Sequence, residues 1–212
     1  GVVAAGLPIA VGAAHAQKVQ HRDAITACFF GDGAINRGPF LEALNWARVY
    51  ELPVLFVCED NRWSATTASG PMTAGDGASA RAAALDIASR QVVGNDVLAV
   101  HEAAAELVAQ VRGGKGPRLL HALTYRVKGH VSVDVAAYRD PVELAAALET
   151  DPLARARAQL LQGGTKASAL DAIENEARAE VEAALAVADA APWPEPGAAF
   201  GDVQDTGAGQ WI

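Results

Sequence analysis

Several patterns that define common classes of protein are missing from this sequence of 212 residues. The formal net charge is −8, so the clustered Lys and Arg that a surface for nucleic acid or anionic lipid needs are lacking. No run reaches about 18 apolar residues, and no basic stretch precedes an apolar one at the N-terminus, which argues against a membrane span and against export. We therefore expect a soluble, cytoplasmic protein that binds neither nucleic acid nor membrane.

Cysteines and nucleotide-binding motifs are also scarce. The two cysteines, Cys28 and Cys58, each lie inside an apolar run, which is typical of reduced core residues rather than of a disulfide or metal pair. No G-x-G-x-x-G loop and no Walker-type lysine loop follows an expected strand, which argues against a plain nucleotide-binding fold. Hydrophobic residues make up 51% of the chain, enough for the core of one large domain with a tail.

The sequence does contain an alternation of short apolar runs and helical periods. Residues 24–30 and 53–58 are almost unbroken apolar runs, which predict parallel strands covered on both faces. The helical period of residues 39–50 between them predicts a right-handed βαβ crossover. Continued alternation predicts an α/β fold with a doubly wound, mostly parallel sheet. Further helices are expected at 7–19, 79–90 and 97–112, and further strands at 91–93 and 119–125.

The C-terminal part of the sequence departs from this alternation. Residues 126–138 predict a surface loop, and helical periods follow it. The segment from Pro192 is rich in Pro and Gly, which is typical of extended or partly disordered chain. We therefore expect three parts: an α/β domain at 1–140, a helical extension at 141–190 and a tail at 191–212.

The most informative segment is Gly31-Asp32-Gly33, which follows the first expected strand and precedes a helix. Open α/β sheets bind ligands at the carboxyl ends of their strands, where the next helix offers unpaired backbone N–H groups. Glycines let the backbone approach a diphosphate, but Asp32 would repel it, and a divalent cation between the two anions removes that repulsion. Oxygen ligands without His or Cys favour Mg²⁺ over zinc.

A second ligand should come from the end of the adjacent strand, where the sequence reads Glu59-Asp60-Asn61. Asn61 lies 29 positions after Asp32. Gly-Asp-Gly alone is commonly a simple turn. The second strand, ending in an asparagine at this spacing, favours a metal site shared by the two strand ends.

This spacing resembles the motif of the thiamine-diphosphate enzymes, which is Gly-Asp-Gly followed by Asn just under thirty residues later. Longer segments resemble the α subunit of the heterotetrameric pyruvate, acetoin or branched-chain 2-oxo acid dehydrogenases: GVVAAGLPIAVGAAHA, FFGDGAINRGPFLEALNWARVYELPVLFVCEDNRW, TYRVKGH and AYRDPVEL. The resemblance covers most of residues 1–161. It implies oxidative decarboxylation of a 2-oxo acid, or cleavage of acetoin, with acyl transfer to a lipoyl acyltransferase component.

The resemblance also implies a metal site and a partner. Asp32 and Asn61 would bind Mg²⁺ through their side chains, and Trp63 would bind it through its backbone carbonyl. A β subunit, in a heterotetramer of two α and two β subunits, would donate the glutamate that acts on the aminopyrimidine of the cofactor. We therefore expect the isolated chain to be inactive.

The remaining cofactor contacts follow from the same resemblance. Gly31 belongs to the diphosphate motif, and the backbone N–H groups of Gly33 and Ala34 would contact the diphosphate. Gly1 and Val3 would contact the aminopyrimidine through backbone atoms.

His130 would contact phosphate and act at the reaction centre, although a lone loop histidine is commonly just solvated. The sequence departs from the family in several respects, and one is Arg37, which stands where the family commonly has Gln. Asp60 replaces the first asparagine of the usual Asn-Asn pair. Either Arg62 neutralises the negative charge of Asp60, or the Asp60 side chain faces away from the metal. Val131 follows His130 where the mammalian pyruvate enzyme has a phosphorylatable serine, so regulation by that route is not expected.

Two other interpretations stay open. One is another thiamine-diphosphate enzyme, of transketolase or decarboxylase type, that shares the metal motif without the lipoyl acceptor. The other is a truncated, catalytically silent domain of the same family. This interpretation is motivated by the start of the chain at Gly1, inside an apolar segment, because the resemblance implies cofactor-phosphate contacts upstream of it.

Overall fold

The chain divides into two compact units, Gly1–Gln159 and Leu160–Ile212. The computed structural model describes residues 2–200 of the chain. No helix among these residues is long and apolar enough to cross a membrane. The three parts expected from the sequence, with boundaries at residues 140 and 190, remain a proposal.

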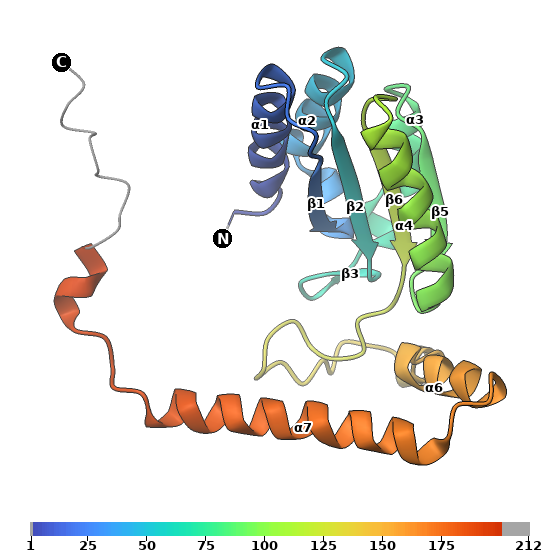
Figure 1. Ribbon diagram of the computed structural model, residues 1–212, viewed down its shortest axis with the longest axis vertical. Coiled ribbons are helices and arrows are strands. Elements are labelled where there is room, and N and C mark those ends of the chain that lie inside the picture. Colours follow the sequence, from blue (N-terminus) through green and yellow to red (C-terminus); the bar gives the residue numbers. More distant parts are fainter. Residues whose placement is uncertain (1, 201–212) are drawn as a thin grey trace. The chain divides into compact units, whose positions relative to one another are not determined.

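A four-stranded parallel sheet forms the centre of the first unit (Figure 1). Its strand order is β1-β2-β6-β5, and every neighbouring pair is parallel. Parallel pairing brings the carboxyl ends of the strands to one edge, where Gly31 lies opposite Glu59 and Asp60 lies opposite Leu123. The strands are β1 (Thr26–Gly31), β2 (Val54–Asp60), β5 (Ser89–Val93) and β6 (Arg118–Leu123).

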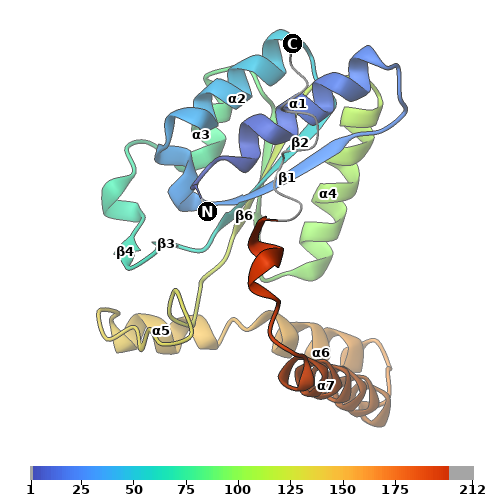
Figure 2. The same cartoon turned by 90° about the vertical axis from the view of Figure 1, so that its left-hand side faces the viewer.

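Helices cover both faces of this sheet (Figure 2). One hydrophobic core lies between the sheet and three helices, and a second core lies between α4 and residues of β2 and β6, including Leu55, Val57 and Leu120. This confirms the doubly wound α/β fold that the alternating pattern predicted. The helices of the first face are α1 (Gly6–Val19), α2 (Gly38–Val49) and α3 (Gly77–Ala83), and α4 (Val97–Arg112) covers the other.

The two strands that lead into the predicted metal site differ in burial. Residues Val54–Cys58 of β2 are buried throughout, as an inner strand requires. In β1, however, Cys28 and Phe30 are buried while Phe29 is 66% exposed. The prediction that both faces are covered is therefore confirmed for β2 and wrong for β1. β1 is an outer strand, and α4 packs on β2, β5 and β6 instead.

Helix α4 has the bounds predicted from its sequence. Its N-terminus is capped by Asp96, whose carboxylate accepts the N–H groups of Leu98 and Ala99, each at 3.1 Å. The prediction for α3 was wrong, because the helix ends at Ala83 instead of continuing to residue 90.

The early end of α3 has a local cause. Asp86 adopts a left-handed backbone conformation with φ of +57°. The N–H of Ile87 then donates to the carbonyl of Ala82 at 3.0 Å, and the Ile87 side chain turns into the core. The chain consequently enters β5 at Ser89, two residues before the predicted start.

The remaining elements are short or C-terminal. The expected loop over residues 126–138 contains no helix or strand. The tail beyond residue 200 lies outside the described residues. The elements are 3₁₀-helices η1 (Asp32–Asn36), η2 (Gly70–Met72) and η3 (Pro196–Phe200), the antiparallel strands β3 (Trp63–Ser64) and β4 (Thr67–Ala68), and helices α5 (Pro141–Leu148), α6 (Pro152–Gln162) and α7 (Ala167–Ala190).

Candidate functional site

Two strand ends meet at a cavity of about 400 Å³, which we call the Asp32–Asn61 cavity. β1 ends at Gly31 and continues directly into η1, whose first residue is Asp32. β2 ends one residue before Asn61. Gly1 lies outside the described residues. Every other predicted site residue lines this cavity, namely Val3, Gly31, Asp32, Gly33, Ala34, Asn61, Trp63 and His130.

Asp32 is buried with an incomplete set of partners. Asp32 is only 3% exposed, and its Oδ2 accepts a hydrogen bond from the hydroxyl of Ser69. Its Oδ1 is buried without a hydrogen-bond partner. Because an unpartnered carboxylate oxygen in the interior is costly, this atom fits a site for a cation.

Asn61 contributes a side-chain amide oxygen to this cavity. Asn61 Oδ1 accepts the backbone N–H of Trp63 at 3.1 Å, a short turn that fixes the segment between them. An amide oxygen has a second lone pair, which stays available for a ligand. Within residues 2–200, no group of three or more His, Cys, Asp and Glu side chains could hold a metal ion. A metal here would depend on amide and carbonyl oxygens beside the single carboxylate, which suits Mg²⁺.

The two glycines that flank Asp32 differ in how tightly they are packed. A Cβ added to Gly33 would lie 2.3 Å from Oγ and 2.8 Å from Cβ of Ser64, in strand β3. A Cβ added to Gly31 would meet its nearest atom, the carbonyl oxygen of Glu59, only at 4.0 Å. The hairpin β3–β4 therefore requires a glycine at position 33 and tolerates a side chain at position 31.

The loop that carries His130 is held by a carboxylate. Asp134 accepts the backbone N–H groups of His130 and Ala136 and the hydroxyl of Tyr138, each at 2.8 Å. The bond from His130 contributes most to holding the pKa of Asp134 below its usual range, followed by those from Tyr138 and Ala136. His130 Nδ1 lies 3.3 Å from a guanidinium nitrogen of Arg126. The exposed His130 ring thus extends from an ordered loop.

A buried arginine, for which we predicted no role from the sequence, joins this loop to the segment of the predicted metal site. Arg139 is 6% exposed and donates to the carbonyls of Arg126 and Lys128. Its guanidinium lies 5.1 Å from the ring centre of Trp63 and 5.7 Å from that of Tyr125. The only sequence signal was the Tyr-Arg pair within AYRDPVEL.

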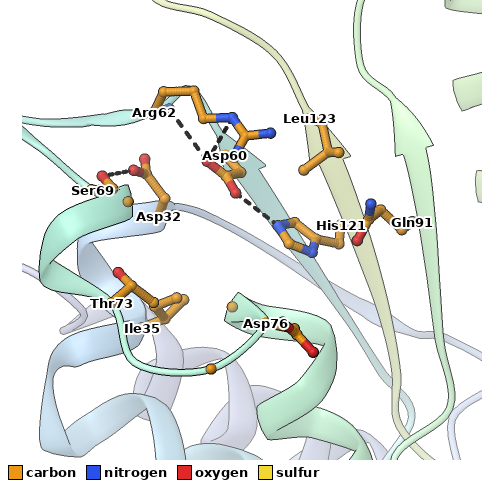
Figure 3. A pocket seen from close by; sticks show the side chains of 13 residues that line it. Asp32, Ile35, Asp60, Arg62, Ser69, Thr73, Asp76, Gln91, His121 and Leu123 are labelled. Atoms are coloured by element: carbon orange, nitrogen blue, oxygen red, sulfur yellow. Dashed lines mark hydrogen bonds and ion pairs between the residues drawn. The ribbon is translucent and has the colours of Figure 1, made fainter.

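A second cavity of about 230 Å³, which we call the His121 cavity, is shown in Figure 3. It shares Asp32 with the first cavity. Buried His121 has partners on both ring nitrogens: Nε2 lies 3.0 Å from Oδ2 of Asp60, and Nδ1 lies 3.1 Å from Oγ of Ser79. Sequence reasoning missed His121 because it lies inside the apolar strand β6.

Asp60 lines the His121 cavity and does not line the Asp32–Asn61 cavity. Its other partner is Arg62, whose backbone N–H donates to Oδ1 at 3.3 Å and whose side-chain Nε lies 3.9 Å from the same atom. Burial alone would raise the pKa of Asp60, but the bond to His121 and the charge of Arg62 outweigh it and lower that pKa. The negative charge of Asp60 is therefore balanced by Arg62, and its side chain is turned away from the predicted metal site.

Comparison with known proteins assigns this chain to a family. The family described as "Dehydrogenase E1 component" matches residues 1–197. The α subunit of acetoin:2,6-dichlorophenolindophenol oxidoreductase from Bacillus subtilis is 36% identical over 96% of this chain. The pyruvate dehydrogenase E1 component α subunit of Rhizobium meliloti is 35% identical over 96% of the chain. The human mitochondrial 2-oxoisovalerate dehydrogenase α subunit is 35% identical over 95%.

The chain is shorter than these relatives. It covers 61%, 59% and 46% of their respective lengths. The match nevertheless extends over almost the whole chain, and it includes both strand ends and the loop of His130. The chain therefore belongs to the α-subunit family of the dehydrogenase E1 components.

Proposed function

We propose that this chain acts as the α subunit of a thiamine-diphosphate-dependent 2-oxo acid or acetoin dehydrogenase, and that it binds the cofactor's diphosphate through one Mg²⁺. The observation that carries the proposal is the buried, unpartnered Oδ1 of Asp32 in the cavity that Asn61 also lines. A hard divalent cation is the partner that such oxygens prefer. The names of the relatives, which include pyruvate, 2-oxoisovalerate and acetoin enzymes, support this class of substrate.

The proposed metal ligands are the side chains of Asp32 and Asn61 and the backbone carbonyl of Trp63. Gly33 and Ala34 lie at the start of η1, where the first N–H groups of a helix are unpaired and suited to an anion. These groups would contact the diphosphate, and the missing side chain of Gly31 would let it approach. When bound, thiamine diphosphate supplies the electron sink for cleavage of the bond next to the substrate's carbonyl.

His130 is the proposed residue at the reaction centre. A bond from Arg126 to Nδ1 requires a lone pair there, so the ring proton of the neutral imidazole lies on Nε2. Nε2 would then donate to the substrate or to phosphate and stabilise negative charge as it develops. Near the N-terminus, Val3 and Gly1 would contact the aminopyrimidine through their backbone atoms.

The cavity also has an apolar wall open to solvent, which supports a partner subunit. Val3 and Phe29 line the cavity and are 57% and 66% exposed. None of the described residues that line it is a glutamate. A β subunit, in a heterotetramer of two α and two β subunits, would cover this wall and donate the glutamate that acts on the aminopyrimidine. The acyl group would pass to a lipoyl acyltransferase component.

Replacing Asp32 tests the metal site directly. Asp32→Ala removes the single carboxylate at the cavity, so we expect Mg²⁺-dependent binding of thiamine diphosphate to weaken by at least about 100-fold, the upper range for loss of a charged partner. Isothermal titration calorimetry with and without EDTA measures it. Asp23→Ala, at an exposed aspartate, is the matched control and should bind like the wild type. Undiminished binding by Asp32→Ala would remove the metal from the proposal.

A further inference from the structure

Ser69 contacts Asp32, which lies 37 positions earlier in the sequence. Ser69 is 7% exposed, and its hydroxyl donates to Oδ2 of Asp32. The other carboxylate oxygen, Oδ1, has no partner. One oxygen of the carboxylate is therefore fixed by the protein, and the other is left for a ligand.

The backbone places Ser69 at this position. Strands β3 and β4 form a hairpin in which Trp63 pairs with Ala68 and Ser64 pairs with Thr67. The hairpin returns the chain to the residues that follow Asn61, and the N–H of Ser69 donates to the carbonyl of Arg62 at 2.9 Å. The backbone of Ser69 is therefore held by a contact that does not involve its side chain.

The loop is tied to η1 at two further points. Ser64 packs against the bare Cα of Gly33, the residue after Asp32. The side-chain amide of Asn36 donates to the hydroxyl of Thr73 at 3.1 Å. Because one residue before Ser69, Ser64, and one residue after it, Thr73, contact η1, the Ser69 hydroxyl approaches Asp32 in a fixed direction.

We propose that Ser69 is a positioning residue for the divalent cation: its hydroxyl holds Oδ2 of Asp32 and so turns Oδ1 toward the metal. This inference rests on the proposed function. A carboxylate can rotate about its Cβ–Cγ bond, and a hydrogen bond to one oxygen selects the rotation in which the other can coordinate. Partners that orient metal ligands in this way typically contribute 10- to 100-fold to metal affinity.

The test is a titration of the full 212-residue chain with Mn²⁺ at saturating thiamine diphosphate, in which electron paramagnetic resonance measures the free Mn²⁺. We expect Ser69→Ala to weaken Mn²⁺ binding by about 10- to 100-fold. Ser69→Thr keeps the hydroxyl and should remain within about threefold of the wild type, a difference well below that range. Ser89→Ala, at an exposed serine in β5, is the control for loss of a serine hydroxyl and should match the wild type.

A merely structural role for Ser69 predicts a different result. It would lower the melting temperature of the metal-free Ser69→Ala chain and leave Mn²⁺ affinity unchanged. Unchanged affinity of Ser69→Ala, or equal weakening by Ser69→Ala and Ser69→Thr, would overturn the inference alone. Failure of the wild-type chain to bind Mn²⁺ with thiamine diphosphate would overturn the proposed function, and the inference with it.

Discussion

The two cavities at the carboxyl ends of the strands share Asp32 but differ in how their polar groups are partnered. In the His121 cavity, His121 has Ser79 and Asp60 as partners, and Asp60 also has Arg62. The shared residue Asp32 has its Oδ1 buried without a partner, and the Asp32–Asn61 cavity also has an exposed apolar wall. Groups that pair with one another support the fold, whereas a buried carboxylate oxygen without a partner fits a bound cation. Substitutions in each cavity and in the His130 loop test this difference.

The largest effect is expected from crowding the Asp32–Asn61 cavity at Gly33. Gly33→Ala would place Cβ 2.3 Å from Oγ of Ser64, so the hairpin or η1 must shift. Displacement of a positioned group by about 1 Å can lower a reaction rate about 100-fold. We expect a loss of similar size, about 100-fold, in the affinity for thiamine diphosphate, measured by calorimetry. Gly31→Ala is the matched control for protein stability only, because its Cβ would meet no protein atom closer than 4.0 Å.

Gly31→Ala should keep the melting temperature of the wild-type chain. An equal loss of stability in both glycine variants would mean that the glycines relax the backbone generally, without a specific requirement at the hairpin.

A smaller effect, and one on stability instead of binding, is expected from the His121 cavity. His121→Leu leaves Asp60 in a largely buried position with Arg62 as its remaining side-chain partner, and should lower the free energy of unfolding by about 2 kcal/mol. Ser79→Ala removes one hydrogen bond and should cost about 1 kcal/mol. Urea denaturation of the metal-free chain measures both.

Cofactor affinity, measured at temperatures where the variants are folded, should change much less in His121→Leu than in Gly33→Ala. If His121→Leu abolished binding while the free energy of unfolding stayed constant, the His121 cavity would belong to the ligand site, and the distinction between the two cavities would be lost.

The smallest effect is expected in the His130 loop and depends on pH. The pKa of Asp134 is lowered because its carboxylate accepts bonds from His130, Tyr138 and Ala136. A lowered pKa means that these bonds favour the ionised form, so they order the loop above the ordinary aspartate pKa of about 3.9. They are lost as the pH falls through the lower folded value. Amide exchange of His130 should therefore accelerate in that acidic window, and Asp134→Asn should remove the pH dependence.

The sequence predicted the features that depend on local pattern. Burial of β2 on both faces follows from its unbroken apolar run, and α4 was bounded correctly because Asp96 and Gly113 mark its ends. The meeting of Asp32 and Asn61 at one cavity follows from parallel pairing, which brings consecutive strand ends to one edge. Their binding of metal remains a proposal.

Features that depend on distant contacts could not be predicted in this way. The bond between Ser69 and Asp32 requires the β3–β4 hairpin, whose two-residue strands leave no periodic pattern. His121 looked like one polar residue in an apolar strand. The end of α3 escaped prediction because Asp86, not glycine, adopts the left-handed conformation that stops the helix.

The close packing of Gly33 against Ser64 restricts the order in which substitutions can accumulate at this site. Any side chain at position 33 would overlap both Oγ and Cβ of Ser64. A prior change of Ser64 to glycine would open the space that an alanine at position 33 needs. Without that change, an alanine at position 33 requires the hairpin or η1 to shift, so the less disruptive order begins at position 64.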